Sequence, residues 1–430
     1  MKSPPMHQTR SSDGGIFIMY GRNPQPGDDF VGYNFFEEPH GFTAEQGFGY
    51  LEIEFGERLG PEGRYEVLRK LGWSIRSTTW LAKDTLTGRF VAIKALSQYA
   101  TQSEKAGLSS ERDVLRKISS CGEGFRETHC LSLLDEFTQP SKADQGEEHI
   151  CLVIDPLGSF SIPARAPWKI DTLPLVKKLL VHTLKGIHHL HSLGIVHTGI
   201  HPSNILTDLG SGPLSLNIEA FLKLRSPEKY PPEETWGGKY VQVAKSQPFP
   251  PPPFEVVMSR SHILSGFGAA QFLDKKTESV STHISFEPPE VLLKLPWDEK
   301  IDIWDFGCLT FASINKQMLF KTLELDLPLD VAMMYQILVL TGERVPAETI
   351  RNSSAARKLL DPETGWLIDD PPRVDLDLYQ INKIIGVLKS VTDLDGATAL
   401  MKKCIRLNPE DRPSAKELLQ DSWLNSNSGV

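Results

Sequence analysis

A lysine and a glutamate are the first side chains in this sequence that point to specific chemistry. Lys94 follows the apolar, strand-like run 91–93, and Glu111 lies in a predicted helix over residues 104–118. Glu111 falls on the apolar face of that helix, because it shares a spacing of three, four and three residues with Leu108, Leu115 and Ile118. A buried carboxylate without a partner is costly, so we expect Glu111 to pair with Lys94. A strand lysine held in this way presents a fixed positive charge, which can interact with an anionic group.

Histidines form a second candidate group, since six of the twelve lie between residues 182 and 201. His188 and His191 are three residues apart in a predicted helix, a spacing that a zinc site can use. The stretch contains no cysteine or carboxylate that would complete the coordination. We therefore favour packing and backbone hydrogen bonding for these histidines over metal binding.

The elements that position Lys94 and Glu111 form a small α+β unit. Three short apolar runs between residues 64 and 96 are separated by a polar loop and by the turn signal Thr87-Gly88, which predicts a β-meander. The predicted helix follows, and two more strand-like runs lie at residues 131–137 and 150–154. The unit is expected to end near Asp155.

The chain beyond Asp155 is predicted to be mostly helical. Residues 173–194 carry apolar side chains close to a 3.6-residue period, and residues 301–314 are apolar enough for a buried helix. We expect residues 1–50 to be a flexible leader, 51–155 the small lobe, 156–424 the large lobe and 425–430 a tail. An insertion at 210–260 contains the run Pro250 to Pro253, for which a stiff surface loop is favoured over a segment that binds a proline-recognising domain.

Composition and charge exclude several functional classes. The 430 residues carry 46 Lys and Arg against 55 Asp and Glu, a formal net charge of -9, which argues against direct nucleic-acid or anionic-membrane binding. Residues 331–340 form an apolar run interrupted only by Gln336, and this run is well short of the roughly 20 residues that span a bilayer. Five cysteines without a C-x-x-C pair indicate reduced thiols. We expect a soluble protein of the cytoplasm, the nucleus or both.

An ordered series of motifs between Arg64 and Leu424 resembles the protein kinase superfamily. LGWSIRSTTWLAKD stands where the glycine-rich loop belongs, VAIK contains Lys94, and IVHTGIHPSN stands at the catalytic loop. ILSGFG stands at the metal-binding D-F-G motif, FEPPE resembles the end of the activation segment, and CIRLNPEDRPSA the closing motif, whose Arg412 would pair with Glu290. The resemblance implies an α+β, two-lobed protein kinase fold with a β-rich small lobe and a helical large lobe.

Within that superfamily the chain looks most like the fungal kinases specific for serine/arginine-rich splicing proteins. The segment KLGWSIRSTTWLAKD is close to their glycine loop, and the insertion falls where their spacer lies. His197-Thr198 stands in place of the usual His-Arg, as it does in these kinases. The resemblance implies ATP as cofactor and Arg/Ser-rich proteins as substrates. It assigns nucleotide contacts to ten residues: Leu71, Gly72, Ser74, Thr79, Ala92, Lys94, Glu111, Asp155, Leu157 and Leu206.

Four positions depart from the chemistry that the resemblance implies. Gly199 replaces the aspartate that accepts the substrate proton, and His201 replaces the lysine that steadies the transferred phosphoryl group. Gly266 replaces the aspartate that binds Mg²⁺, so that Asn204 is left as the matched but neutral metal ligand. Ser74 replaces a loop glycine. Because the family places aspartate at both glycine positions, we expect aspartate to fit at 199 and at 266.

These departures predict a pseudokinase that acts through a protein partner, with weak ATP binding and weak or no Mg²⁺ binding. Losing the general base costs about 10²–10⁴-fold in rate, and losing the metal carboxylate leaves the phosphate charge poorly neutralised. His201 could serve as a substitute base, but we favour this less because it cannot replace the metal ligand. Two alternatives stay open: an active serine/threonine kinase for Arg/Ser-rich proteins, and a purely structural interaction module without nucleotide.

Overall fold

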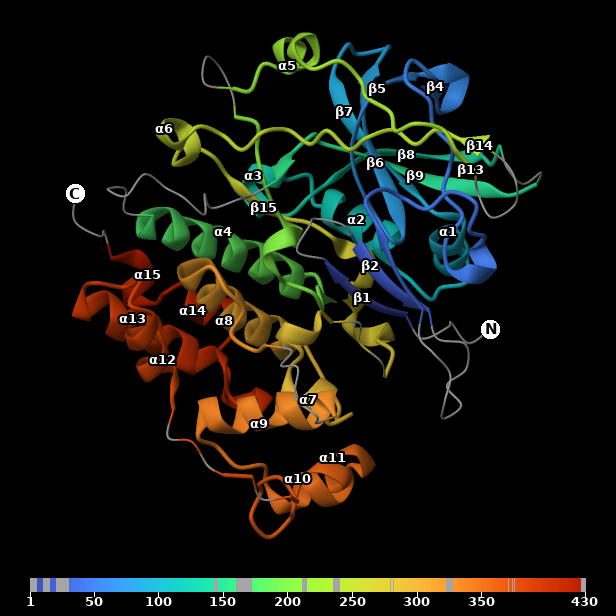
Figure 1. Ribbon diagram of the computed structural model, residues 1–430. Helices are drawn as coiled ribbons and strands as arrows, with labels where there is room; N and C mark the ends of the chain where they lie inside the picture. Colours follow the sequence, from blue (N-terminus) through green and yellow to red (C-terminus); the bar gives the residue numbers. More distant parts are fainter. Residues whose placement is uncertain are drawn as a thin grey trace. The chain divides into compact units, whose positions relative to one another are not determined.

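The fold is described from a computed structural model (Figure 1). It describes residues 6–10, 16–20, 31–142, 146–159, 172–210, 215–234, 240–278, 280, 282–321, 328–369, 371–372, 374 and 376–426. The expected leader, insertion and tail therefore lie partly outside the described residues. The chain divides into two compact units, the first made of residues 1–112, 132–158 and 209–250 and the second of the remainder. Most of the insertion thus groups with the strands and not with the helices that flank it in sequence.

A six-stranded antiparallel sheet is the centre of the first unit, in the order β4-β5-β6-β7-β9-β8. Its strands are β4 (Arg58–Leu59), β5 (Tyr65–Ser74), β6 (Ser77–Asp84), β7 (Phe90–Leu96), β8 (Leu133–Pro140) and β9 (Glu148–Ile154). Alternate side chains bury one face in a core that includes Val67, Trp80 and Ile93. β5 and β6 are joined at residues 75–76, where Ser74 pairs with Ser77. The predicted meander is present.

The helix expected over residues 104–118 is two helices, so this prediction was wrong in extent. Helix α1 spans Gln98–Lys105 and helix α2 spans Glu111–Ser119. Gly107, at φ +70, lies in the turn between them, and Leu108 is 76% exposed and not on an apolar helix face. A positive φ favours glycine because other residues are strained there. Leu115 and Ile118 are buried as expected.

The expected leader contains ordered structure. Strands β1 (Met6–Arg10), β2 (Ile16–Tyr20) and β3 (Val31–Phe35) form an antiparallel sheet. Phe48 and Tyr50 are buried in a cluster with Ile75 of the β5–β6 turn, and Phe35, Phe42 and Trp73 pack against it. The region therefore differs from a flexible leader. Low periodicity hid this packing, because aromatic side chains in an irregular segment leave no helical or strand pattern.

The insertion also packs on the first unit. It carries α5 (Ile218–Leu224) and the short pair β13 (Glu233–Glu234) and β14 (Tyr240–Val241). Phe221 and Phe249 are buried against Leu81 of β6, with Leu71 and Phe90 beside them. Arg69 of β5 donates to the carbonyl oxygens of Leu222 and Arg225 at 3.3 and 2.5 Å. Arg69 thus satisfies carbonyl groups at the end of α5.

The second unit is mainly helical. α4 (Leu173–Ser192) and α8 (Lys300–Asn315) pack together, and α13 (Val391–Cys404) packs on α8 (Figure 1). α8 is buried along nearly its whole length, as its composition predicted. The other helices are α3 (Phe125–Thr128), α6 (Phe254–Val257), α7 (Pro289–Leu292), α9 (Leu329–Thr341), α10 (Ala347–Asn352), α11 (Ser354–Leu359), α12 (Leu378–Ile385), α14 (Ala415–Leu418) and α15 (Ser422–Asn425).

Short strands hold the loops at one end of α4. β10 (Gly158–Ser159), β12 (Ile205–Thr207) and β15 (His262–Leu264) form one small sheet, and β11 (Ile195–Val196) pairs with β16 (Gln271–Phe272). In the part of the chain that the structure describes, no helix combines the length and apolar character needed to cross a membrane.

Candidate functional site

The pair predicted from sequence, Lys94 and Glu111, is present in the first unit. Lys94 Nζ lies 2.5 Å from Glu111 Oε1, and the two side chains are 20% and 7% exposed. Glu111 is the first residue of α2, and its N–H donates to Glu104 Oε1 at 2.8 Å. Glu104 accepts from the N-terminus of α2 as a capping residue would. Lys94 is therefore held in place at the sheet by a helix whose start is itself fixed.

The segment at the glycine-loop position is a tight hairpin with its polar groups engaged. The hydroxyl oxygens of Ser74 and Ser77 are 3.0 Å apart, and Ser74 Oγ accepts from the N–H of Arg76 at 3.3 Å. Tyr50 of the leader donates its hydroxyl to the carbonyl oxygens of Ser74 and Ile75 at 3.0 and 2.8 Å. Gly72 and Thr79 face each other across the two strands. The loop is thus held by the leader as well as by its own strands.

Lys70, one strand position before Leu71, joins the leader, the sheet and the insertion. Its buried ammonium group donates to Glu37 at 2.6 Å, to Glu38, and to the carbonyl oxygen of Ala244 at 3.0 Å. Glu37 also accepts from the N–H and the hydroxyl of Ser246 at 2.6 and 2.7 Å. We call Lys70, Glu37, Glu38, Ala244 and Ser246 the Lys70 clasp.

Electrostatics within the clasp favour the charged forms. Burial alone would raise the pKa of Glu38, but the hydrogen bond from His40 and the positive charge of Lys70 lower this pKa below its usual value. Sequence reasoning missed the clasp, because its carboxylates lie in a segment that lacks periodicity. The adjacent pair of glutamates in an otherwise apolar stretch, FFEEP, is the one signal that could have suggested it.

The other expected nucleotide contacts of the first unit lie on or beside the same sheet face. Ala92 is buried and lies opposite Leu81 in the β6–β7 register. Leu71 packs in the cluster that contains the insertion residues Phe221 and Phe249. Asp155 pairs with the exposed Arg89 at 3.6 Å, and Leu157 is 8% exposed. Leu71, one of the expected nucleotide contacts, is therefore partly covered by this unit's own insertion.

The second unit contains the remaining predicted residues, and a buried aspartate organises them. Asp302 of α8 accepts from the N–H groups of His197 and Thr198, both at 2.8 Å, and lies 2.9 Å from His191 Nε2. Thr198 has φ +66, a strained value for a β-branched residue. Asp302 thus holds the backbone in the turn that leads to Gly199. Leu206 lies on β12, opposite Ile263 of β15.

Gly199, His201 and Asn204 meet in one hydrogen-bonded group. Asn204 Nδ2 donates to the carbonyl oxygen of Gly199 at 2.8 Å and lies 3.0 Å from His201 Nε2. The ring of His201 lies near those of His283 and Phe286, with centroids 5.9 and 6.2 Å away. The amide nitrogen of Asn204 thus contacts both Gly199 and His201. The sequence analysis identified these residues as the positions of the lost base and the lost lysine.

An aspartate has room at one of the two glycine positions and meets a neighbouring side chain at the other. A Cβ added at Gly199 would have its nearest neighbour at 3.9 Å. A Cβ added at Gly266 would lie 2.3 Å from Asn204 Oδ1 and 2.4 Å from its Cγ, and Gly266 has φ +82. The expectation that aspartate fits therefore holds at Gly199, whereas at Gly266 the Asn204 side chain would have to move to make room.

This arrangement does not fit a magnesium ion. Mg²⁺ is normally held by one or two carboxylates together with phosphates. The residues at the expected site are two glycines, a histidine and Asn204, whose amide nitrogen faces Gly199 and His201. Across the described residues, no group of three His, Cys, Asp or Glu side chains is arranged to hold a metal ion. His191, one of the two zinc candidates, is paired with Asp302.

The fold-maintaining residues of the second unit are in place. Arg412 donates to both carboxylate oxygens of Glu290 at 2.6 and 2.8 Å, and both side chains are buried. This confirms the pair that the motifs predicted. His197 Nε2 lies 2.9 Å from the carbonyl oxygen of Ser265, and its ring packs on Phe267. The scaffold around Gly199 and Gly266 is therefore intact.

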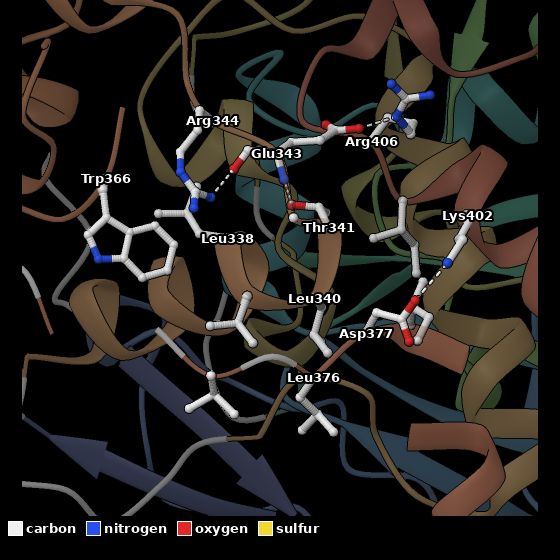
Figure 2. Close-up of a pocket in the computed structure, with 15 residues that line it drawn as sticks. Leu338, Leu340, Thr341, Glu343, Arg344, Trp366, Leu376, Asp377, Lys402 and Arg406 are labelled. Atoms are coloured by element: carbon white, nitrogen blue, oxygen red, sulfur yellow. Dashed lines mark hydrogen bonds and ion pairs between the residues drawn. The ribbon is translucent and has the colours of Figure 1, made fainter. Parts of the chain in front are cut away.

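A cavity of about 600 Å³ in the second unit contains none of the predicted site residues. Figure 2 shows Leu338, Leu340, Leu376 and Trp366 on its apolar wall. Its two carboxylates are paired, Asp377 with Lys402 at 2.8 Å and Glu343 with Arg406 (Figure 2). The guanidinium group of Arg344 lies over the Trp366 ring at 4.5 Å. The cavity thus combines apolar walls with charges that are largely neutralised by their neighbours.

Comparisons with known proteins concern the domain and its fold. The family model for the protein kinase domain matches residues 65–221 and 257–424. A solved crystal structure of a kinase domain superposes with a TM-score of 0.62 at 19% identity, covering 87% of this chain and 99% of that one. At that identity the likeness concerns the fold, and it supports the expected two-lobed architecture.

Two of three curated relatives match most of the length of the chain. The serine/threonine-protein kinase SRPK of Physarum polycephalum is 26% identical over 87% of this chain and 89% of its own. A serine/threonine protein kinase of Aspergillus fumigatus is 26% identical over 84% of each. The mouse SRSF protein kinase 3 is 32% identical over 38% of this chain and 28% of its own. These relatives support the resemblance that the motifs predicted.

Proposed function

Because the chain belongs to the protein kinase family, we propose that it is a catalytically impaired member, a pseudokinase that acts by binding a protein partner. The observation that carries this proposal is the relationship between Gly266 and Asn204. The residue at 266 has no carboxylate, and the Asn204 side chain stands where that carboxylate would begin. The site therefore lacks the charge that holds a metal ion on the phosphates of ATP.

The missing base adds to the loss. Gly199 offers no proton acceptor, and His201 Nε2 already lies 3.0 Å from Asn204 Nδ2. A general base contributes about 10²–10⁴ in rate, or roughly 3–5 kcal/mol of barrier. Phosphoryl transfer relies still more on charge neutralisation and positioning. Losing both together favours a protein-binding role over slow catalysis.

Nucleotide has a smaller part in the proposal, as a weak ligand that needs no metal. The Lys94–Glu111 pair offers one cation for a phosphate group. Against this, Leu71 packs with insertion residues, and the Ser74 and Ser77 hydroxyls bond to each other. These contacts compete with a nucleotide for the groups that would hold it.

The rival function is an active serine/threonine kinase for Arg/Ser-rich proteins. The names of the relatives, SRPK and SRSF protein kinase 3, favour it, as do the intact Lys94–Glu111 and Glu290–Arg412 pairs. The two functions predict opposite effects of Mg²⁺ on ATP binding. A purely structural module predicts that ATP has no effect at all.

The deciding experiment measures the melting temperature of the full chain with millimolar ATP, with and without Mg²⁺, beside a phosphorylation assay on an Arg/Ser-repeat peptide. We expect a small stabilisation that is the same with and without Mg²⁺, and no transfer. Transfer at about 1 s⁻¹, the low end for kinases, or a large stabilisation that requires Mg²⁺, would overturn the proposal. The Gly199→Asp variant is the matched control, because the fold has room for it and it still lacks the metal carboxylate.

A further inference from the structure

In the proline-rich run of the insertion, the less exposed residues are three positions apart. Pro248, Pro250, Pro251 and Pro253 are exposed, whereas Phe249 is 3% exposed and Pro252 is half-buried. Consecutive prolines favour the polyproline II helix, which has about three residues per turn, and Pro253 has φ −54 and ψ 148, within that region. Residues 249 and 252 therefore share one edge of the helix. The two other edges are open to solvent.

Gln247 and Phe249 fix the start of this run to the first unit, and the exposed prolines take no part in these contacts. The Gln247 N–H donates to the carbonyl oxygen of Lys70 at 2.8 Å, and its side-chain amide donates to that of Ser226 at 2.9 Å. The ring of Phe249 packs on Phe221, with centroids 5.2 Å apart. A partner would therefore meet a segment whose residues 247–249 are already ordered, and binding there would lose little conformational entropy.

The positive charge of Lys245 at one end of the segment would set the orientation in which a partner binds it. Lys245 precedes Pro248 by three residues, and Pro251 follows Pro248 by three, so the chain reads Lys-x-x-Pro-x-x-Pro. Lys245 pairs with Glu228 at 3.1 Å, and the two side chains are 37% and 58% exposed. An exposed pair of this kind contributes little to stability. Lys245 can therefore exchange Glu228 for a carboxylate of a partner.

We propose that residues 245–253 are a docking segment for an SH3-type domain. Such domains bind P-x-x-P segments in the polyproline II form within a groove lined by aromatic side chains. Pro248 and Pro251 would occupy that groove, and Lys245 would pair with acidic residues at its end. The burial of Phe249 decides against a domain that reads the aromatic side chain before the prolines, because that domain would have to remove Phe249 from its cluster with Phe221 and Leu81.

This docking segment is independent of nucleotide binding and of phosphoryl transfer. It gives the proposed protein-binding role a physical surface, but it would serve an active enzyme equally well. Failure of one proposal therefore leaves the other standing, and the experiment below requires neither ATP nor activity.

The test measures binding of the full chain to a purified, ¹⁵N-labelled SH3 domain that recognises Lys/Arg-x-x-Pro-x-x-Pro peptides. We expect shifts in the resonances of its aromatic groove and acidic rim. Pro248→Ala with Pro251→Ala should weaken binding at least about tenfold, and Lys245→Glu should also weaken it. Pro231→Ala with Pro232→Ala is the matched control, because these two prolines are also exposed and lie in the same insertion. The control should bind like the parent.

Three outcomes would overturn the proposal. The first is no perturbation of the SH3 domain by the parent chain. The second is equal binding by the parent and by the Pro248→Ala, Pro251→Ala variant, when both have the same melting temperature. The third is binding to a WW or EVH1 domain in place of the SH3 domain. A Phe249→Ala variant tests the EVH1 case, because a domain that recognises the Phe249 side chain should no longer bind this variant, whereas the Lys-x-x-Pro-x-x-Pro positions are unchanged.

Discussion

Asn204 fills the space that Gly266 leaves. A Cβ at position 266 would lie 2.3 Å from Asn204 Oδ1, while Asn204 Nδ2 donates to the carbonyl oxygen of Gly199 at 2.8 Å. The asparagine that would be a metal ligand in the family is therefore used to connect the two positions at which the carboxylates are missing. Its side chain cannot move without giving up hydrogen bonds to Gly199 and His201.

The first prediction compares aspartate at the two glycine positions. Gly266→Asp should destabilise the fold by about 1–3 kcal/mol, as overpacking does, although aspartate tolerates a positive φ better than most residues. Gly199→Asp should change stability by less than about 0.5 kcal/mol, because its Cβ has room. Urea unfolding of the two variants measures the difference. Combining Gly266→Asp with Asn204→Ala should cost less than the sum of the single changes, and an additive result would contradict the steric argument.

The second prediction concerns Lys94. Lys94→Met should remove any stabilisation by ATP and should also cost about 1–3 kcal/mol, because Glu111 is left 5% exposed without its partner. Melting curves with and without ATP measure both effects. If ATP stabilises the variant as much as the parent, the nucleotide does not contact Lys94.

The third prediction concerns the Lys70 clasp. Lys70→Met should destabilise the fold by about 3–5 kcal/mol, since it leaves the buried Glu38 carboxylate without its cation. Lys229→Met is the matched control, because Lys229 pairs with a Glu54 side chain that is 59% exposed and should cost less than about 1 kcal/mol. Equal losses in a denaturant titration would mean that burial does not strengthen the clasp.

The fourth prediction is a loss of stability in acid caused by three packed histidines. His129, His182 and His262 have ring centroids 4.0 and 5.6 Å apart along the series. Burial, and then the charges of neighbouring histidines and lysines, lower the pKa of His182 to about 2 and that of His262 to about 3, and burial also lowers that of His129. Between these values and about 6.5, the unfolded chain binds protons that the folded chain does not. Stability should therefore be full above about pH 6.5 and fall as the pH drops.

The loss should be at most about 1.4 kcal/mol per histidine between pH 7.5 and 5.5. His182→Gln should reduce the slope of stability against pH, because glutamine does not titrate. Glutamine also keeps an acceptor for the backbone N–H of His262, which donates to His182 Nδ1 at 3.0 Å. His188→Gln controls for replacing a histidine elsewhere on α4. Melting temperatures across this pH range test the prediction, and an unchanged slope in His182→Gln would refute the role of the trio.

The sequence predicted the parts of the site that local patterns determine. Lys94 follows the apolar run 91–93 within β7, and Glu111 shares a face with Leu115 and Ile118, so their pairing followed from burial. The spacing also included Leu108, which is exposed because it lies in the connection between α1 and α2, before α2 begins at Glu111. Periodicity alone cannot detect a break when an apolar residue falls in register beyond it.

Contacts between distant segments could not be predicted in the same way. Gly266 and Asn204 are each ordinary residues in the sequence, and their steric conflict exists only after β12 and β15 pair and bring the two together. Likewise, Lys70 and Glu38 are 32 residues apart, and the adjacent glutamates of FFEEP do not by themselves indicate which residue they pair with. Such relationships depend on the fold and not on any local pattern.

The Lys70 clasp has a consequence for how this chain can vary. One ammonium group contacts Glu37 and Glu38 before the sheet and Ala244 far beyond it, so the three segments depend on a single cation. A fragment that starts at residue 51 would keep the buried lysine and lose both carboxylates. Among homologous chains, we expect the glutamate pair, the strand lysine and the insertion to be inherited or lost as a set.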